Sequence, residues 1–352
     1  MKYLLKYKLL MTIIVILFWS CEKELDSILP EDNVITSSVF STELGSRSAV
    51  IGIYSTAQDK DAFGGTTMSL DAFWADDARF VGTFTTFRNV RDYAMLSDNG
   101  SIEAVWRDLY QVIGAANNAI IQIPLSPDTQ FQEATRNQLV GEAKFLRALS
   151  YFNLANNFSQ PYQFSNGSND CVPLVTEVFS DPSQLNNFKL KRNTLNEIHQ
   201  FIEDELLEAK DLLPVSIGGP GRASTGAAQA LLARLKLYRE EWETAANLAN
   251  DVINTGTYLL SSDYTFYDKA TSEDVFTIIN TSDDGQDANI GLSEFFNPVQ
   301  AGGRGDAPYS ENLLEAYDQF VDRRFIDLNQ EGRDAARETS IFTSKFPDGE
   351  NR

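Results

Sequence analysis

Residues 141–154 read Gly-Glu-Ala-Lys-Phe-Leu-Arg-Ala-Leu-Ser-Tyr-Phe-Asn-Leu, and this stretch decides the fold. Its apolar side chains recur at intervals of three and four residues, which brings them onto one face of an α-helix. The pattern extends in both directions and predicts a helix from Thr135 to Phe158, interleaved with the charged residues Glu142, Lys144 and Arg147. A helix with such a wide apolar face needs other helices to cover it, so the sequence predicts a helical core.

Other segments repeat this helical spacing. Helices are expected from Phe40 to Gln58 and from Ser101 to Ile123, the second of which stops before Pro124. A further helix is expected after Thr194, because Glu197 stands three residues later and completes a capping box. Pro214 ends that helix.

Two more helices are expected at Gly226–Tyr238 and Trp242–Asn254, with only three residues between them. Such a short connection forces an antiparallel hairpin. Small alanines face large side chains in this pair, which is typical of a tetratricopeptide-type repeat unit. The second helix is expected to pack inward through Trp242, Ala245, Ala246, Ala249 and Ile253.

The predicted fold class is therefore all-α, built from tetratricopeptide-type hairpins with long loops and a little β structure. The helices at Thr135–Phe158 and Thr194–Leu213 are expected to form a second hairpin with a long insertion. A short β-like run is expected at Asp274–Asn280, and a short helix at Glu311–Tyr317.

The N-terminus has the pattern of an export signal. A lysine-bearing start runs into an apolar stretch, Leu9 to Trp19, and then into Ser20 and Cys21. We expect residues 1–20 to be a lipoprotein signal peptide, Cys21 to be lipidated, and residues 21–35 to form a flexible tether. Residues 36–352 then form the helical domain. The alternative is an ordinary cleaved signal in which Cys21 is incidental, while a transmembrane anchor would need about 20 apolar residues.

The net charge, the two cysteines and the single histidine exclude several classes of partner and site. Fifty acidic residues against 29 basic ones give a formal net charge of −21, which repels phosphate backbones and makes nucleic acid an unsuitable partner. Cys171 is the second of two cysteines, so a lipidated Cys21 leaves no pair for an intrachain disulfide. His199 is the single histidine and lies within an amphipathic helix, which excludes metal motifs with two histidines and predicts a structural role.

Several segments, in this order, resemble the SusD/RagB family of outer-membrane nutrient-binding lipoproteins. They are Cys21-Glu-Lys-Glu-Leu-Asp26, Phe40–Tyr54, Gly141–Leu154, Pro173-Leu-Val175, Ala223–Arg234, Trp242–Ile253, Tyr309–Asp318 and Asp322-Arg323-Arg324. The family usually continues with further helices, one with an Ala-Glu-Ala signature, so we expect the domain to be C-terminally incomplete.

The resemblance implies a right-handed superhelical scaffold that packs on a TonB-dependent, SusC-like transporter in the outer membrane. It implies capture of oligosaccharides or peptides at the cell exterior, with a lipid anchor holding the protein to the outer membrane. The acidic residues after Cys21 resemble the signal that sends such lipoproteins to the outer face of the cell.

Candidate ligand residues combine flat apolar faces with polar groups, as sugar recognition requires. The segment 71–79 supplies Asp71, Phe73, Trp74, Asp76 and Arg79. In the family this region and a later loop tend to contribute to the ligand face, so the second choice is residues 289–304, with Phe295, Phe296 and Asn297. The alternative is that these aromatic residues fill the core, as expected for Trp106, Tyr151 and Trp242.

Three further possibilities stay open. Asp283, Asp284, Asp287 and Asn289 could hold structural calcium through oxygen ligands, although they do not follow an EF-hand order and fit a solvated acidic loop. A helical glycoside hydrolase would need paired carboxylates, and the adjacent Asp76 and Asp77 would point in different directions. A helical-repeat adaptor would bind proteins instead. No catalytic residue, metal ligand or cofactor is predicted, and we expect a binding protein rather than an enzyme.

Overall fold

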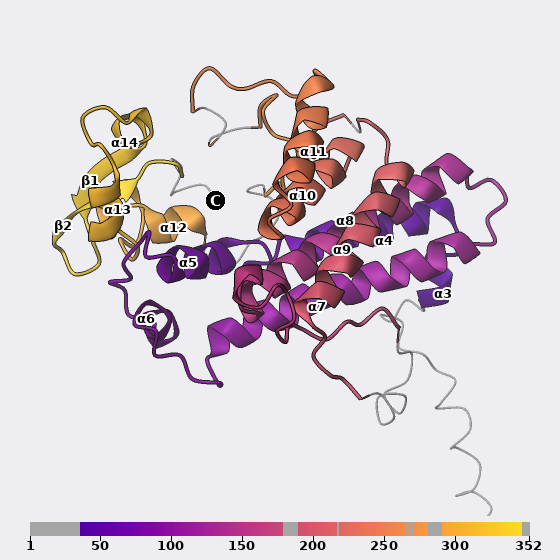
Figure 1. Cartoon of the computed structure of the whole chain (residues 1–352), viewed down its shortest axis with the longest axis horizontal. Coiled ribbons are helices and arrows are strands. Elements are labelled where there is room, and N and C mark those ends of the chain that lie inside the picture. Colours follow the sequence, from indigo (N-terminus) through magenta and orange to yellow (C-terminus); the bar gives the residue numbers. More distant parts are fainter. Residues whose placement is uncertain are drawn as a thin grey trace, which may run out of the picture.

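A computed structural model describes residues 36–178, 189–216, 218–264, 267, 270–280 and 291–346 (Figure 1). The predicted signal peptide, Cys21 and the tether lie outside the described residues, and so does the predicted calcium loop at 283–289. Within the described part of the chain, no helix is both long and apolar enough to cross a membrane.

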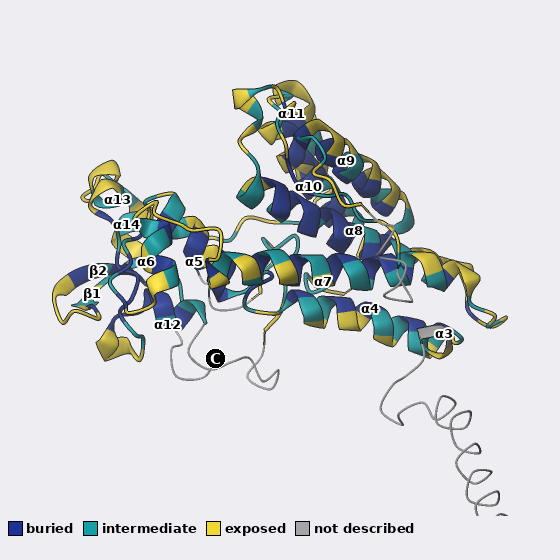
Figure 2. Cartoon of the chain, turned by 90° about the horizontal axis from the view of Figure 1, so that it is seen from below, coloured by how far each residue is buried: buried dark blue, intermediate teal, exposed yellow. Residues whose placement is uncertain are grey.

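The body of the protein is a group of long packed helices. After the short α3 (Thr36–Val39), these are α4 (Glu43–Ala57), α7 (Gly100–Gln122), α8 (Glu133–Phe158) and α9 (Leu195–Leu212). The central helix α8 packs against α7 and α9, and α4 packs against both α7 and α8. Figure 2 shows buried residues along the facing sides of α7, α8 and α10. The helical prediction, including the pairing of α8 with α9, is confirmed.

Side-chain caps fix where these helices begin. The Thr194 side chain accepts a hydrogen bond from the backbone N–H of Glu197, and the Glu197 carboxylate accepts one from the N–H of Thr194. This is the predicted capping box. Asn99 caps α7 in a similar way through the N–H groups of Ser101 and Ile102. Each cap satisfies donors that the first helical turn leaves without partners.

The hairpin of α10 (Thr225–Tyr238) and α11 (Trp242–Asn254) is also confirmed, but its predicted inner face is partly wrong. Helix α11 packs inward through Ala245, Leu248 and Val252. Trp242 is 59 % exposed, Ile253 is 65 % exposed, and Ala246 and Ala249 are exposed as well. These four lie on one edge of a broad apolar arc, and α10 covers the other edge of that arc.

Charged residues on α8 are buried in pairs rather than solvated. Arg147 donates two hydrogen bonds to Glu205 on α9, from Nε over 2.8 Å and from Nη2 over 2.6 Å, and a third to Asn117 on α7. Lys144 contacts Glu205 over 2.8 Å. Because each buried charge has a partner, the polar residues of the 141–154 stretch join α8 to its neighbours.

The remaining elements form a lobe at one end of the helical body, on the left in Figure 1. It contains α5 (Gly65–Trp74), α6 (Thr85–Arg91), α12 (Leu292–Phe296), the 3-10 turn η5 (Val299–Ala301), α13 (Glu311–Ala316), α14 (Arg323–Asp327) and the antiparallel strands β1 (Asn329–Arg333) and β2 (Thr339–Thr343). The short helix predicted at Glu311–Tyr317 is thus confirmed. The β-like run predicted at 274–280 forms no strand, and Thr277 instead donates a backbone hydrogen bond to Pro220.

Cys171 and His199 are both buried. The His199 ring stacks on Tyr162 with an interplanar angle of 13°, and burial lowers its pKa to about 4. Burial also raises the pKa of the Cys171 thiol. Both residues therefore fill the core in uncharged form, as the sequence predicts.

Candidate ligand-binding face

Two aromatic residues meet at the C-terminal end of α5. Trp74 is the last residue of this helix, and the Tyr93 hydroxyl donates a hydrogen bond of 2.8 Å to the Trp74 carbonyl oxygen. That carbonyl is one of the groups a helix end leaves without an internal partner. The Tyr93 ring stays 67 % exposed. The bond therefore holds a flat apolar surface in one place while leaving it open to solvent.

The backbone at Tyr93 supports this arrangement. Its φ angle is 52°, in the left-handed region that residues with a side chain seldom adopt. Such a conformation costs on the order of 1 kcal/mol and persists where the surrounding structure holds it. Here two backbone hydrogen bonds tie the turn to α6: the Tyr93 N–H donates to the Val90 carbonyl oxygen, and the Ala94 N–H donates to the Asn89 carbonyl oxygen.

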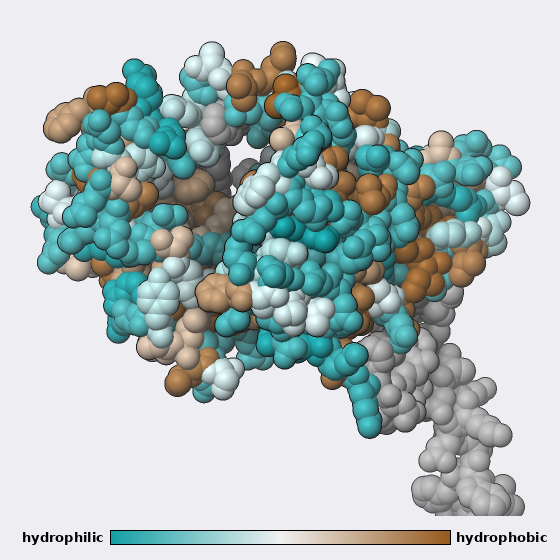
Figure 3. Space-filling model, in the orientation of Figure 1, coloured by the Kyte–Doolittle hydropathy of each residue, from teal (hydrophilic) through white to brown (hydrophobic). Residues whose placement is uncertain are grey.

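Trp74 is half-buried and supplies the inner edge of this face. It lines a narrow crevice between α5, α7 and the end of α8, together with Thr67, Leu70, Ile102, Val105, Asn157 and Phe158. We call Met68, Asp71, Trp74 and Tyr93 the α5 face, because the first three lie on α5 and Tyr93 is bonded to its end. Figure 3 shows the surface hollowed between the lobe and the α10–α11 hairpin, and α5 runs below this hollow in Figure 1.

Asp71 provides the polar group of the α5 face. It lies one helical turn before Trp74 and is exposed as a residue. Nevertheless, enough protein surrounds its carboxyl group that burial raises its pKa to about 6. In the described part of the chain no side chain donates to this carboxylate. It is therefore mostly ionised at pH 7 and able to accept hydrogen bonds from a ligand hydroxyl.

Two of the predicted ligand residues hold the lobe together instead. Asp76, with φ of 58°, accepts a hydrogen bond from the Asn312 side chain. Arg79 donates from Nη2 to Ser340 Oγ over 2.7 Å and lies 3.7 Å from the Asp334 carboxylate. The intervening backbone pairs with the 306–310 segment through an isolated bridge between Ala78 and Tyr309. These contacts join the chain after α5 to the lobe and so fix the end of α5.

The other predicted ligand residues are core residues, which corrects the prediction. Phe73, Phe295 and Asn297 are each at most 1 % exposed, and Phe296 is also buried. Phe73 and Phe295 join one aromatic cluster through Phe87, at centroid distances of 6.0 and 5.3 Å. Asn297 donates to the Phe346 carbonyl oxygen and accepts from Gln330. These aromatic residues, on α5, α6 and α12, thus extend the hydrophobic core of the helical body into the lobe.

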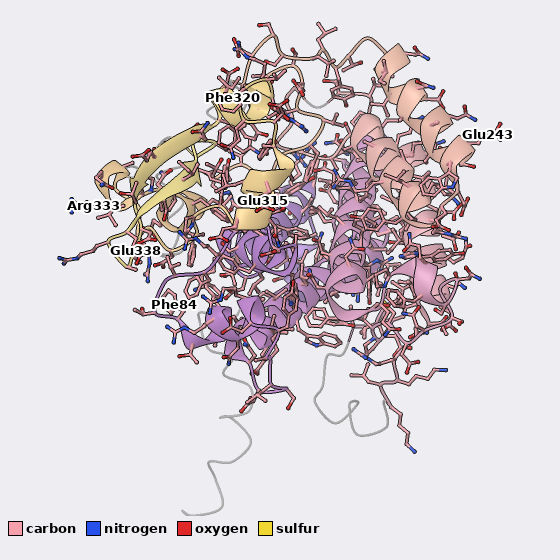
Figure 4. The ribbon with its side chains drawn as sticks, turned by 60° about the vertical axis from the view of Figure 1, so that its left-hand side comes forward. Phe84, Glu243, Glu315, Phe320, Arg333 and Glu338 are labelled. Atoms are coloured by element: carbon pink, nitrogen blue, oxygen red, sulfur yellow. The ribbon has the colours of Figure 1, made fainter. Side chains whose placement is uncertain are left out.

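Phe84 lies at the edge of this aromatic cluster, in contact with Phe87 and Phe295. Figure 4 shows it below the hairpin residues Arg333 and Glu338. The Arg304 guanidinium stacks over the Phe84 ring, 4.6 Å from its centroid, and pairs with Asp306 over 2.7 Å. One face of this ring is therefore already covered, so Phe84 offers less open aromatic surface than Tyr93.

One group of carboxylates in the described residues lies close enough to suggest a cation. Asp59, Asp61 and Asp108 each bring an oxygen to within 4.8 Å of the others. Arg107, however, donates two hydrogen bonds to Asp108, over 2.7 and 3.0 Å. This guanidinium supplies a counter-charge, and we assign no metal to the group.

Comparison with known proteins shows which family the chain belongs to. A family model named SusD-like, described as starch-binding and associating with the outer membrane, matches residues 35–237, which is more than half of the chain. The chain belongs to this SusD-like family. The family as a whole is carbohydrate-binding and outer-membrane associated.

Individual SusD-like relatives are distant. The chain is 27 % identical over 252 residues to SusD-like protein P2 of Formosa agariphila, a match covering 71 % of this chain and 46 % of that protein. It is 22 % identical over 275 residues to a SusD-like protein of Bacteroides ovatus, covering 74 % and 47 % of the two chains. The chain thus spans about half the length of the curated relatives it matches.

Solved structures share the fold. A SusD superfamily protein from Bacteroides vulgatus has a TM-score of 0.76 and 23 % identity, over 88 % of this chain and 69 % of that one. A laminarin-binding SusD-like protein has a TM-score of 0.69 and 23 % identity, over 86 % and 71 % of the two chains. The SusD-like identification and the tetratricopeptide-type helical fold are therefore confirmed.

The predicted ligand residues include two of the four residues of the α5 face, Asp71 and Trp74, but not Met68 or Tyr93. Tyr93 lies in a loop with other aromatic residues, and nothing in the local pattern separates it from Phe80 or Phe87, which are buried. The one usable signal is its hydroxyl, because a tyrosine can bond at one end and present its ring at the other.

Proposed function

We propose that this protein captures oligosaccharides at the bacterial cell surface and delivers them to a TonB-dependent, SusC-like transporter in the outer membrane. The observation that carries this proposal is the exposed Tyr93 ring held by its bond to the Trp74 carbonyl oxygen. A fixed aromatic face binds the CH groups of a sugar ring without the cost of ordering a mobile side chain. Asp71, one helical turn before Trp74, would accept hydrogen bonds from sugar hydroxyls.

The comparisons support the ligand class. Membership of a carbohydrate-binding family favours glycans over peptides as ligands. One structural neighbour is a laminarin-binding SusD-like protein, so laminarin is a sensible first probe. The fold similarity also favours a role in which the protein binds without turning over its ligand.

Attachment and delivery form the second part of the proposal. Acylated Cys21 would hold the protein on the outer membrane facing the exterior, and residues 22–35 would let the helical domain move as a lid over the transporter. Locking this tether to the transporter should abolish uptake while leaving glycan binding intact. Unimpaired uptake would refute the lid.

Isothermal titration with laminarin tests the binding function. We expect saturable binding by the wild-type protein, and a loss of at least tenfold in affinity for Tyr93→Ala and for Trp74→Ala. Trp242→Ala is the matched control, because Trp242 is also an exposed aromatic residue but lies on α11. An equal loss in the control would contradict the assignment of the α5 face. Release of reducing sugar by the purified protein would replace capture with hydrolysis.

A further inference from the structure

Acidic residues stand close in sequence to the aromatic pair of the α5 face, Trp74 and Tyr93. One precedes Trp74 by a helical turn, one follows it by three residues, and two flank Tyr93 in the loop after α6. All four are exposed: Asp71, Asp77, Asp92 and Asp98. The Asp77 backbone is held in place, since its carbonyl oxygen accepts a hydrogen bond from the Ser310 N–H.

The arginines near this face are directed to protein acceptors. Arg91 donates to the Asp92 carboxylate over 2.7 Å and also to the Phe80 carbonyl oxygen. Arg88 donates to the Gly82 carbonyl oxygen, and Arg79 to Ser340. Of the four carboxylates, only Asp92 has an arginine partner among the described residues. Asp71 and Asp77 therefore present carboxylates that no described arginine pairs with.

We propose that the α5 face selects uncharged glycans and rejects glycans that carry sulfate or carboxylate groups, through Asp71 and Asp77. The inference rests on the proposed glycan-binding function and adds the substrate class to it. A carboxylate only accepts hydrogen bonds, so it pairs with sugar hydroxyls, which can donate. Sulfates and uronate carboxylates are acceptors too, and bring like charge to the same place.

The net charge of the whole protein and the carboxylates of the α5 face both weaken the binding of anionic glycans, so an experiment must separate the two effects. The whole protein carries a net charge of −21, which repels any polyanion at long range and is screened by salt. Asp71 adds a short-range contribution, because it lies on α5 one helical turn before Trp74, and salt screens charges a few ångströms apart much less than charges separated by more than a Debye length.

Binding to an array of oligosaccharides tests the selection. The array carries laminari-, malto-, xylo- and manno-oligosaccharides beside sulfated laminarin and alginate oligomers, and each hit is titrated at low and at physiological salt. We expect sulfated laminarin to bind at least tenfold more weakly than laminarin. In Asp71→Asn/Asp77→Asn this ratio should fall at least threefold, because the sulfated glycan binds more tightly.

The matched control removes two exposed carboxylates elsewhere. Glu243→Gln/Asp251→Asn changes the net charge equally but acts on α11, so it should leave the ratio unchanged. Thermal unfolding verifies that both double variants fold.

Three results would overturn the inference. If charged glycans bind as tightly as uncharged ones, or if both double variants change the ratio equally, glycan capture stands and the selection by Asp71 and Asp77 falls. If the protein binds no glycan on the array, the proposed function falls and the selection falls with it.

Discussion

The guanidinium of Arg222 forms two parallel hydrogen bonds to the Glu142 carboxylate, from Nε over 2.8 Å and from Nη2 over 2.7 Å. Glu142 lies in the middle of α8 and is fully buried. Its carboxylate also accepts from the Tyr54 hydroxyl over 2.8 Å and from Gln138 over 2.9 Å. The bonds therefore join α8 to α4 and to the loop before α10, and leave no lone pair of the buried charge without a partner.

Replacing Arg222 by Ala should lower the free energy of unfolding by about 2–3 kcal/mol, because it removes the counter-charge of a buried carboxylate. The Arg222 side chain is 30 % exposed, so water can reach part of the gap, and the loss should stay below the 3–5 kcal/mol typical of a wholly buried pair. Urea unfolding measures this difference.

Arg234→Ala is the control for that experiment, since Arg234 is an exposed arginine on the neighbouring α10. It should change the free energy of unfolding by less than about 0.5 kcal/mol. Equal effects of the two substitutions would show that the bonds to Glu142 contribute little.

Replacing Phe73 or Trp242 should change stability in the opposite way to what the sequence predicts for these two residues. Trp242 is expected in the core and is 59 % exposed, whereas Phe73 is a predicted ligand residue and is 1 % exposed. Phe73→Ala should therefore cost about 3–5 kcal/mol of stability, and Trp242→Gln should stay within about 0.5 kcal/mol. Thermal or urea unfolding of both variants decides. A large loss in Trp242→Gln would mean that this side chain is covered in solution.

The sequence predicted the helices well because their signals are local. The spacing in 141–154, the capping box at Thr194 and the short connection after Tyr238 each lie within a few residues, and each is confirmed. The resemblance in the order of these segments predicted the family, and the family model that matches residues 35–237 confirms it.

The partners of individual side chains could not be predicted in this way. Glu142 reads as a solvated residue on a helix, and its partner Arg222 stands 80 residues away. Periodicity also cannot say which edge of the broad apolar arc on α11 its neighbour covers. For the same reason Phe73 and Tyr93 look alike in sequence, although one fills a core and the other is exposed.

His199 should make stability depend on pH in the mildly acidic range. Its pKa is lowered from 6.5 to about 4, first by burial and then by the charge of Arg239. Below pH 6.5 the unfolded chain binds a proton that the folded protein does not, so stability falls as the pH drops from 6.5 to 4. Over this range the loss amounts to about 3 kcal/mol, at 1.36 kcal/mol for each pKa unit.

His199→Phe isolates this effect, because it keeps a ring against Tyr162 and removes the titrating group. Asp71 acts in the opposite direction, since its raised pKa favours the protonated folded state as the pH falls to about 6 and below. The quantity to measure is therefore the difference in unfolding free energy between wild type and variant at pH 7 and pH 4.5. A difference that does not change with pH would refute the assignment to His199.

The hydroxyl of Tyr93 should contribute to ligand affinity through the position of its ring. In Tyr93→Phe the ring remains but loses the 2.8 Å bond to the Trp74 carbonyl oxygen, which water can then satisfy. A hydrogen bond of this kind is worth about 0.5–1.5 kcal/mol, so glycan affinity should fall by about 2- to 10-fold. Tyr93→Ala, which also removes the ring, should lose more.

Isothermal titration of wild type, Tyr93→Phe and Tyr93→Ala with one glycan separates the two contributions. Tyr309→Phe is a suitable control, because the Tyr309 hydroxyl also donates to a backbone carbonyl, that of Leu328, within the lobe. If Tyr93→Phe binds like wild type while Tyr93→Ala does not, the ring matters and its bond does not. In that case the left-handed backbone at Tyr93 would itself be enough to position the ring.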